Sequence, residues 1–296
     1  MIQNKIKGVG VALITPFKDY EVDYEALGRM VDYVIEGGVD YIVALGSTAE
    51  TATMSLEERD KVLRFIVKQT AGRVAIVAGM GGNDTHALVE QLRTFDLSDT
   101  VAILSVVPYY NKPSQEGVYR HFMAVAEASP LPIVLYNIPG RTGVNMTPET
   151  VARLVASSDK FIGIKEASGN VEQMQRICES TNGDFFLTSG DDGLTVEAVR
   201  KGGVGVLSVL GHLYPAQVKQ LTDAANEGRY EEAEQILDEL MPITDSLFEE
   251  GNPVGIKTAL SIKGVCGATV RLPLAEGSEA LREKQIRLIA EYETSK

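Results

Sequence analysis

The chain has 296 residues, of which 44% are hydrophobic and 23% charged, as expected for a globular protein with a sizeable core. Its net charge of −13 and its scattered basic residues argue against a nucleic-acid partner. No segment is long and apolar enough to span a membrane. The two cysteines, Cys178 and Cys266, lie far apart, so we expect no disulfide framework and a reducing, cytoplasmic location.

Short apolar runs alternate with helix-like stretches from the N-terminus to about residue 214. Such spacing is typical of βα units. We expect a strand in each of eight runs, at residues 9–17, 41–46, 74–78, 101–107, 133–137, 161–165, 185–189 and 204–209.

The segments between these runs carry helix signals. Ser55-x-x-Glu58 resembles a capping box, and Thr147-Pro148 places a capping hydroxyl before a first-turn proline. The glycine pairs 37–38 and 202–203 are typical of helix ends.

Eight βα units predict a (β/α)₈ barrel over residues 1–225, followed by a helical region over 226–296. The stretches 231–240 and 281–292 of that region are amphipathic. A doubly wound sheet is the alternative, because periodicity cannot show that a sheet closes. Such a sheet favours a glycine-rich turn after its first strand, and residues 14–17 read Ile-Thr-Pro-Phe.

Lys165 lies in the predicted sixth strand, within the run FIGIKEAS at 161–168. Lysine is rarely buried without a partner. Burial favours the neutral amine, a nucleophile that can form a Schiff base with a carbonyl group. The ordinary alternatives are an ion pair with a nearby carboxylate or a side chain that extends out of the strand end.

The other strands of a barrel would bring polar groups to the same rim, since catalytic groups come from the C-terminal ends of the strands. Each candidate also has an ordinary structural role, such as helix capping, aromatic packing, a subunit interface or a surface charge. For Asp191 and Asp192 we favour helix capping over catalysis. The candidates are Ser47, Thr48, Tyr109, Tyr110, Tyr136, Arg141, Asp191 and Asp192.

Together these groups predict a class I aldolase or lyase that acts on a 2-oxo acid. Lys165 would form the imine, Tyr136 would transfer protons, and Ser47 with a second tyrosine would relay them. Arg141 and the backbone N–H groups of the turn at 46–48 would each bind a carboxylate. No metal or other cofactor is required, and the three histidines show no metal-binding spacing.

Four strings carry a resemblance to a known family: PYYNKPSQEG at 108–117, YNIPGRTG at 136–143, GIKEASGN at 163–170 and SGDD at 189–192. The chain resembles the pyruvate-dependent aldolases that include dihydrodipicolinate synthase and N-acetylneuraminate lyase. The resemblance extends over essentially the whole length. It implies that Lys165 forms an imine with pyruvate, that Tyr136 donates and accepts protons, and that Ser47 and Tyr110 complete the relay.

The strings are most similar to the synthase branch of this family. That branch condenses pyruvate with L-aspartate 4-semialdehyde on the diaminopimelate route to lysine. The resemblance implies that Thr48 and the main chain at Leu207 hold pyruvate, and that Arg141 binds the carboxylate of the semialdehyde. It also implies a homotetramer, a dimer of dimers in which Tyr110 crosses an interface into a neighbouring site.

Two features depart from the synthase pattern. The second-strand turn reads GSTAE where the family usually has GTTGE, so the relay hydroxyl is kept, and Ala49 should avoid a positive φ. In lysine-inhibited members, the inhibitor site uses a histidine and a glutamate. The resemblance places these positions at Arg59 and Ala87, so we predict weak or absent inhibition by lysine.

Three other functions remain open at this stage. An N-acetylneuraminate or 2-keto-3-deoxy-gluconate lyase would share the imine but should not need Arg141. A barrel acting on phosphate esters would use the glycine cluster at 202–205 to bind phosphate, although this cluster more simply ends a helix. A non-enzymatic scaffold would leave Lys165 unreactive.

Overall fold

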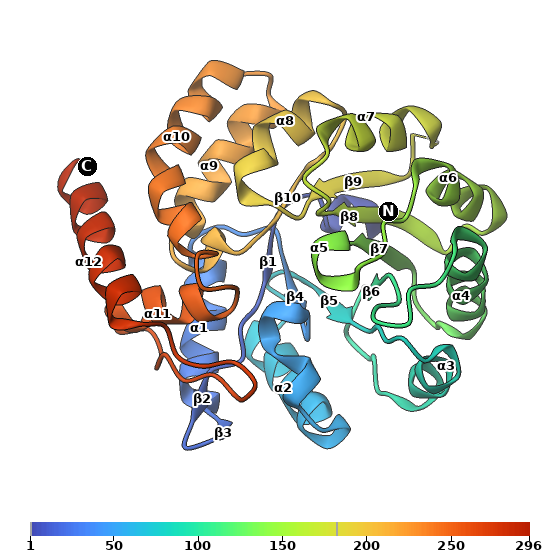
Figure 1. The fold of residues 1–296 in the computed structure, drawn as a ribbon, viewed down its shortest axis with the longest axis horizontal. Helices are drawn as coiled ribbons and strands as arrows, with labels where there is room; N and C mark the ends of the chain where they lie inside the picture. Colours follow the sequence, from blue (N-terminus) through green and yellow to red (C-terminus); the bar gives the residue numbers. More distant parts are fainter. Residues whose placement is uncertain (1, 182) are drawn as a thin grey trace.

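The computed structural model describes residues 2–181 and 183–296. Eight parallel strands close into a barrel in the order β1-β10-β9-β8-β7-β6-β5-β4 (Figure 1). They are β1 (Gly8–Ala12), β4 (Tyr41–Ala44), β5 (Ala75–Gly79), β6 (Ala102–Val106), β7 (Ile133–Asn137), β8 (Phe161–Glu166), β9 (Phe186–Ser189) and β10 (Gly205–Ser208). Each of the eight predicted runs overlaps one of these strands, and β1 pairs with both β4 and β10. The predicted barrel is therefore confirmed, and the doubly wound sheet is excluded.

The first predicted run is wrong at its C-terminal half. The barrel strand ends at Ala12, and Phe17–Lys18 (β2) instead pairs antiparallel with Glu21–Val22 (β3) in a separate hairpin. The ladder ends before Pro16 is reached: Ile14 N donates to His212 Nε2 and not to a strand. Pro16 cannot restore the ladder, because proline has no N–H to donate.

A ring of helices covers the outside of the barrel (Figure 1). They are α1 (Tyr24–Glu36), α2 (Leu56–Thr70), α3 (Thr85–Thr94), α4 (Gln115–Ala128), α6 (Pro148–Ser157), α7 (Val171–Ser180), α8 (Thr195–Arg200) and α9 (Pro215–Asn226). The predicted caps are present: Ser55 and Glu58 form a capping box on α2, and Thr147 caps α6. Gly38 and Gly202, which follow α1 and α8, take positive φ values of 89° and 100°. That backbone conformation favours glycine.

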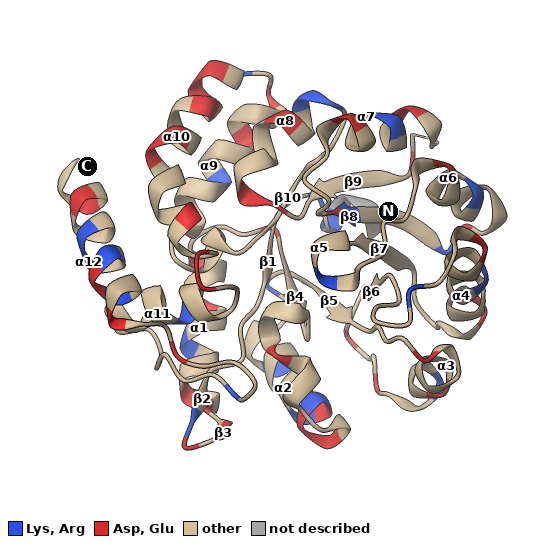
Figure 2. Ribbon diagram, in the orientation of Figure 1, with Lys and Arg blue, Asp and Glu red and all other residues tan. Residues whose placement is uncertain are grey.

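The apolar core has two main layers. Alternate strand residues, including Val43, Leu104, Val134 and Phe186, fill the barrel interior. The other strand faces pack against the helices in a larger cluster. Charged residues lie mainly on the helices and loops around the barrel (Figure 2). The barrel interior is almost entirely apolar, and Lys165 is a buried polar residue at one end of it.

Three further helices follow the barrel: α10 (Tyr230–Ser246), α11 (Val254–Ile262) and α12 (Glu279–Thr294). Helix α10 packs against α8 and α9 through a third apolar cluster that includes Leu221 and Leu237. Helix α12 lies at the far left edge of the molecule in Figure 1. Both stretches predicted to be amphipathic helices, 231–240 and 281–292, are helical. No described helix has the length and apolar character needed to cross a membrane.

Candidate active site

Lys165 is the penultimate residue of strand β8 and is 6% exposed. Its neighbour across the ladder is Tyr136 of β7, and the ammonium nitrogen lies 4.5 Å from the centre of the tyrosine ring. Tyr136 is also 6% exposed. The two groups that the sequence assigned to imine formation and proton transfer are therefore in contact at the C-terminal ends of neighbouring strands.

The ordinary alternatives for Lys165 do not apply. Among the residues described, Lys165 belongs to no ion pair within 4.0 Å. Its side chain does not extend into bulk solvent, because it remains buried. The Lys165 amine therefore lies at the edge of a mostly apolar barrel interior, beside Tyr136 and not against a carboxylate.

Gly190, which follows β9, provides the space that the Lys165 side chain occupies. A Cβ atom at Gly190 would lie 2.7 Å from Cβ of Ala167, and 2.8 Å from Cε and 3.2 Å from Cγ of Lys165. Any larger residue would therefore displace the lysine. Gly190 belongs to the SGDD string, but its contact with Lys165 was not predicted from the sequence.

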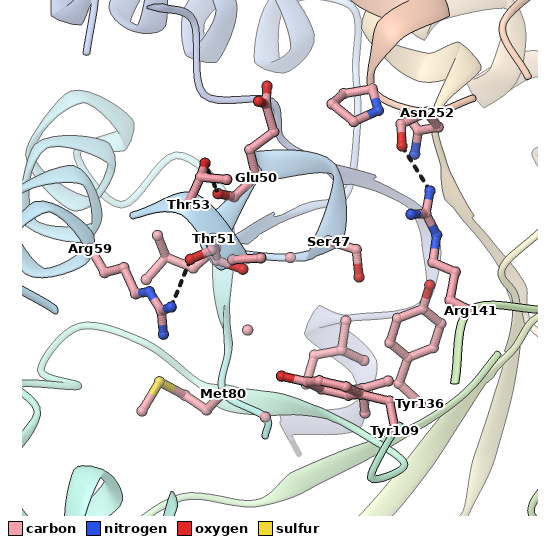
Figure 3. Close-up of a pocket in the computed structure, with 18 of the residues that line it drawn as sticks. Ser47, Glu50, Thr51, Thr53, Arg59, Met80, Tyr109, Tyr136, Arg141 and Asn252 are labelled. Carbon is pink, nitrogen blue, oxygen red and sulfur yellow. Dashed lines mark hydrogen bonds between the residues drawn. The ribbon is translucent and has the colours of Figure 1, made fainter. Parts of the chain in front are cut away.

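Two adjoining cavities open at this end of the barrel. The smaller, of about 210 Å³, is lined by Lys165, Tyr136, Ser47, Thr48 and Arg141, among others. The larger, of about 390 Å³, shares Ser47, Tyr136 and Arg141 with it. Figure 3 shows Ser47, Tyr136 and Arg141 on one side of the larger cavity, with the hydroxyl groups of Ser47 and Tyr136 directed to the same region. Five of the predicted site residues thus surround one space.

The turn that carries Ser47 and Thr48 is a short 3₁₀ helix, η2 (Ser47–Ala49). Neither hydroxyl caps a helix at this turn, and α2 is capped by Ser55 instead. Ala49 avoids a positive φ as predicted, while the next residue, Glu50, adopts the left-handed conformation with φ 57°. Ser47 is exposed to the cavity and Thr48 is buried beneath it.

Asn252, which precedes α11, connects two of the predicted binding residues. Its side-chain Nδ2 donates a hydrogen bond of 2.9 Å to Thr48 Oγ1, and its backbone carbonyl oxygen accepts one of 2.8 Å from Arg141 Nη2. Figure 3 shows the second bond as a dashed line. The role of Asn252 could not be predicted from the sequence, because Thr48 lies 204 residues away and no local pattern marks the contact.

The strands β7 and β8 end in buried polar groups that the sequence analysis also missed. Asn137 and Glu166, next to Tyr136 and Lys165, are both 0% exposed. Burial raises the pKa of Glu166, and hydrogen bonds donated by Ser168, Asn137 and Gln173 oppose this shift. The signal in the sequence for Glu166 was a carboxylate in a mostly apolar, buried strand.

Asp191 and Asp192 have structural roles, as favoured from the sequence. Asp191 accepts a hydrogen bond from Gly193 N and begins the 3₁₀ helix η4 (Asp192–Leu194). Asp192 is buried and accepts hydrogen bonds from Ser208 and from the backbone N–H groups of Val209 and Leu210. It therefore ties the end of β10 to the loop after β9. Burial raises the pKa of Asp192.

Two predicted site residues lie apart from the Lys165 cavity in the single chain. Tyr110 is 89% exposed, with a positive φ of 70°. Its neighbour Tyr109 lines the larger cavity. Leu207 is buried inside the barrel and lines a void of about 10 Å³ together with Lys165. That void is too small for a substrate, so the roles predicted for Tyr110 and Leu207 stay predictions.

A closed (β/α)₈ barrel with a buried lysine and a tyrosine at neighbouring strand ends defines the imine-forming, class I aldolases. Comparison with known proteins agrees with this class. Residues 5–292 match the model of the dihydrodipicolinate synthetase family, and the chain belongs to that family.

Named relatives cover nearly the whole chain. The 4-hydroxy-tetrahydrodipicolinate synthase of Phocaeicola vulgatus is 46% identical over 98% of both chains. That of Parabacteroides distasonis is 49% identical over 93% of both chains. Among solved structures, a dihydrodipicolinate synthase from Acinetobacter baumannii, complexed with pyruvate, superimposes with a TM-score of 0.94. It is 36% identical, and the match covers 97% of this chain and 99% of that one.

Proposed function

We propose that this chain condenses pyruvate with L-aspartate 4-semialdehyde, the reaction of 4-hydroxy-tetrahydrodipicolinate synthase. The observation that carries the proposal is the contact between Lys165 and Tyr136 in a cavity that Arg141 also lines. The names of the relatives support the same reaction.

The first half of the reaction uses the groups at the strand ends. The neutral amine of Lys165 attacks the ketone carbon of pyruvate, and loss of water leaves an imine. The imine withdraws electrons from the adjacent methyl carbon, which loses a proton to give an enamine. Tyr136, in contact with the lysine, is placed to carry protons to and from the reacting atoms. Ser47, on the same cavity, would pass them on.

The second half forms the new carbon–carbon bond. The enamine carbon attacks the aldehyde carbon of the semialdehyde, and the resulting alkoxide takes up a proton. The amino group of the semialdehyde then displaces Lys165 from the imine carbon, which closes the ring and frees the enzyme. Arg141, at the junction of the two cavities, would bind the carboxylate of this second substrate.

The resemblance to the family supports a homotetramer in which Tyr110 contributes to a neighbouring site. The 89% exposure of Tyr110 in the single chain is compatible with a residue that a second subunit covers. Thr48 and the backbone at Leu207 remain the proposed pyruvate contacts.

Borohydride reduction in the presence of pyruvate tests the imine. We expect a stable pyruvyl adduct on the peptide that contains Lys165, detected by mass spectrometry, and none in Lys165→Ala. An unmodified Lys165 peptide in the wild-type protein would overturn the mechanism. Formation of product from pyruvate and aspartate semialdehyde, without cleavage of N-acetylneuraminate or 2-keto-3-deoxy-gluconate, then distinguishes the synthase from its nearest rival.

A further inference from the structure

The reacting pair and a buried polar pair occupy successive positions of the same two strands. In the β7–β8 ladder, Tyr136 is paired with Lys165 and Asn137 with Glu166. Side chains alternate between the two faces of a strand. Tyr136 and Lys165 therefore face the barrel interior, while Asn137 and Glu166 face the surrounding helices. Any sliding of one strand against the other would move both pairs together.

Neutral donors surround the Glu166 carboxylate. Oε1 accepts a hydrogen bond of 2.7 Å from Ser168 N. Oε2 accepts bonds of 3.0 Å from Asn137 Nδ2 and 3.2 Å from Gln173 Nε2. Asn145 completes the cluster, because its Oδ1 accepts bonds of 2.7 Å from Asn137 and 3.0 Å from Gln173. We call Glu166, Asn137, Asn145 and Gln173 the Glu166 network.

The network also anchors the loop that carries Arg141. Asn137 Oδ1 accepts a hydrogen bond of 2.9 Å from Met146 N, and Asn137 Nδ2 bonds to Asn145. One side chain at the end of β7 thus holds the far end of segment 138–146, in which Arg141 lies on the short helix α5 (Pro139–Thr142). The positions of Lys165, Tyr136 and Arg141 consequently depend on the same hydrogen bonds.

A buried carboxylate with only neutral partners is costly to the folded state, and an apolar residue of similar shape would cost less. A stability role alone does not account for it. We propose that Glu166 is a positioning residue, which sets the offset between β7 and β8 and so holds the Tyr136 hydroxyl against the imine formed on Lys165. This inference rests on the function proposed above.

Glu166→Gln tests the proposal with little change of shape. The three groups that contact the Glu166 carboxylate all donate hydrogen bonds. In Glu166→Gln an NH₂ group replaces one carboxylate oxygen, so this NH₂ group must face at least one N–H donor. We expect kcat to fall by about tenfold to a hundredfold, because small misplacements of reacting groups have effects of that size. The KM for pyruvate should change by less than about threefold, since no pyruvate contact is removed.

A compensating variant separates positioning from folding. In Asn137→Asp the network would contain two facing carboxylates, so this variant should also lose activity. In the double variant Asn137→Asp/Glu166→Gln, the new amide can donate to the new carboxylate while Asn145 and Gln173 rotate their amides. We expect the double variant to recover most of the lost kcat. If Glu166→Gln does not fold, Gln173→Met leaves the carboxylate in place and removes the Gln173 bonds to Glu166 and Asn145, which should lower kcat by about threefold or more.

Asp32→Asn is the matched control. Asp32, on α1, accepts hydrogen bonds from Gln69 of α2 and from Arg73, which follows α2, and it lines neither of the two active-site cavities. The control makes the same chemical change and should lower Tm without changing kcat.

The borohydride rate with pyruvate serves as a second readout. Slower trapping in Glu166→Gln than in the wild-type protein would support the proposal. Equal trapping and equal kcat in the two proteins would overturn the positioning role and leave the proposed function intact, as would a double variant no better than the single ones. Absence of trapping in the wild-type protein would overturn both.

Discussion

The ammonium of Lys257 lies 2.5 Å from the carboxylate of Glu50, in an ion pair whose side chains are 0% and 2% exposed. Lys257 belongs to α11, whereas Glu50 follows directly after the turn that carries Ser47 and Thr48. Lys257 also donates to Thr269 O, and Arg271 N donates to the other oxygen of Glu50. Burial lowers the pKa of Lys257, and Glu50 opposes the shift. The C-terminal helices therefore hold the substrate turn through buried charges.

Removing one partner of this pair should destabilise the protein strongly. Lys257→Met leaves the Glu50 carboxylate buried without its cation, which costs about 3–5 kcal/mol. The change is measured as the urea midpoint at fixed protein concentration. The double variant Glu50→Gln/Lys257→Met should regain part of the loss. The exposed pair Lys284–Glu249 provides a control, since Lys284→Met should change stability by about 0–1 kcal/mol. Equal effects of the two lysine substitutions would contradict this prediction.

Arg141 should determine the second substrate rather than the first. A charge-assisted hydrogen bond contributes about 1.5–3 kcal/mol, so Arg141→Ala should raise the KM for aspartate semialdehyde by about tenfold to a hundredfold. Borohydride trapping of pyruvate on Lys165 should be unchanged. Arg141→Lys should recover only part of the binding, because lysine lacks the bidentate geometry. Unimpaired condensation by Arg141→Ala would favour the lyase alternative.

Gly190 should be intolerant of even one added carbon. Gly190→Ala places a methyl group 2.7 Å from Ala167 Cβ and 2.8 Å from Lys165 Cε, so both must move. We expect kcat/KM for pyruvate to fall by about tenfold or more, because the amine is displaced from its position in the site. We also expect Tm to fall, because the methyl group of Ala167 cannot rotate away and its backbone must shift. Gly193→Ala, in the same loop, would meet its nearest atoms at 3.4 Å and serves as the control. Similar activity of the two variants would show that the lysine tolerates the displacement.

Inhibition by lysine should be weak or absent. Arg59 lines the larger cavity and donates a hydrogen bond of 2.6 Å to Thr51 O, while Ala87 lies exposed on α3. A guanidinium repels the ammonium of lysine, and alanine offers it no carboxylate. Steady-state rates with added lysine test this. An inhibition constant in the millimolar range or tighter would refute the prediction, and Arg59→His/Ala87→Glu should strengthen inhibition.

Tyr110 should act on a neighbouring subunit. Tyr110→Phe and Lys165→Ala should each be nearly inactive as pure proteins, with unchanged assembly in sedimentation experiments. When the two chains are co-expressed and mixed at random, about a quarter of the sites should combine an intact Lys165 with an intact Tyr110 from its neighbour. Recovery of activity in the mixture would support a shared site. A mixture as inactive as its components would show that Tyr110 does not contribute to the active site of a neighbouring subunit.

Local sequence patterns were enough to predict the barrel and the centre of the site. Strand and helix signals repeat over a few residues, and strand ends in a barrel share one rim. The sequence alone therefore predicts that Lys165, Tyr136, Ser47, Thr48 and Arg141 lie together. The error at residues 13–17 arose because the apolar run continues to Phe17, whereas the ladder ends at Ala12 and Ile14 N bonds to His212, 198 residues away.

The supports of the site depended on contacts between distant parts of the chain. Asn252 reaches Thr48 across 204 residues, and Lys257 reaches Glu50 across 207. No periodic pattern marks such pairs, because their partners are selected by the packing of α11 against the barrel rim. Glu166 was visible as a carboxylate in an apolar strand, but its donors became known only when β7, β8 and α7 were assembled. Residue order thus specified the reacting groups, whereas folding specified what holds them in place.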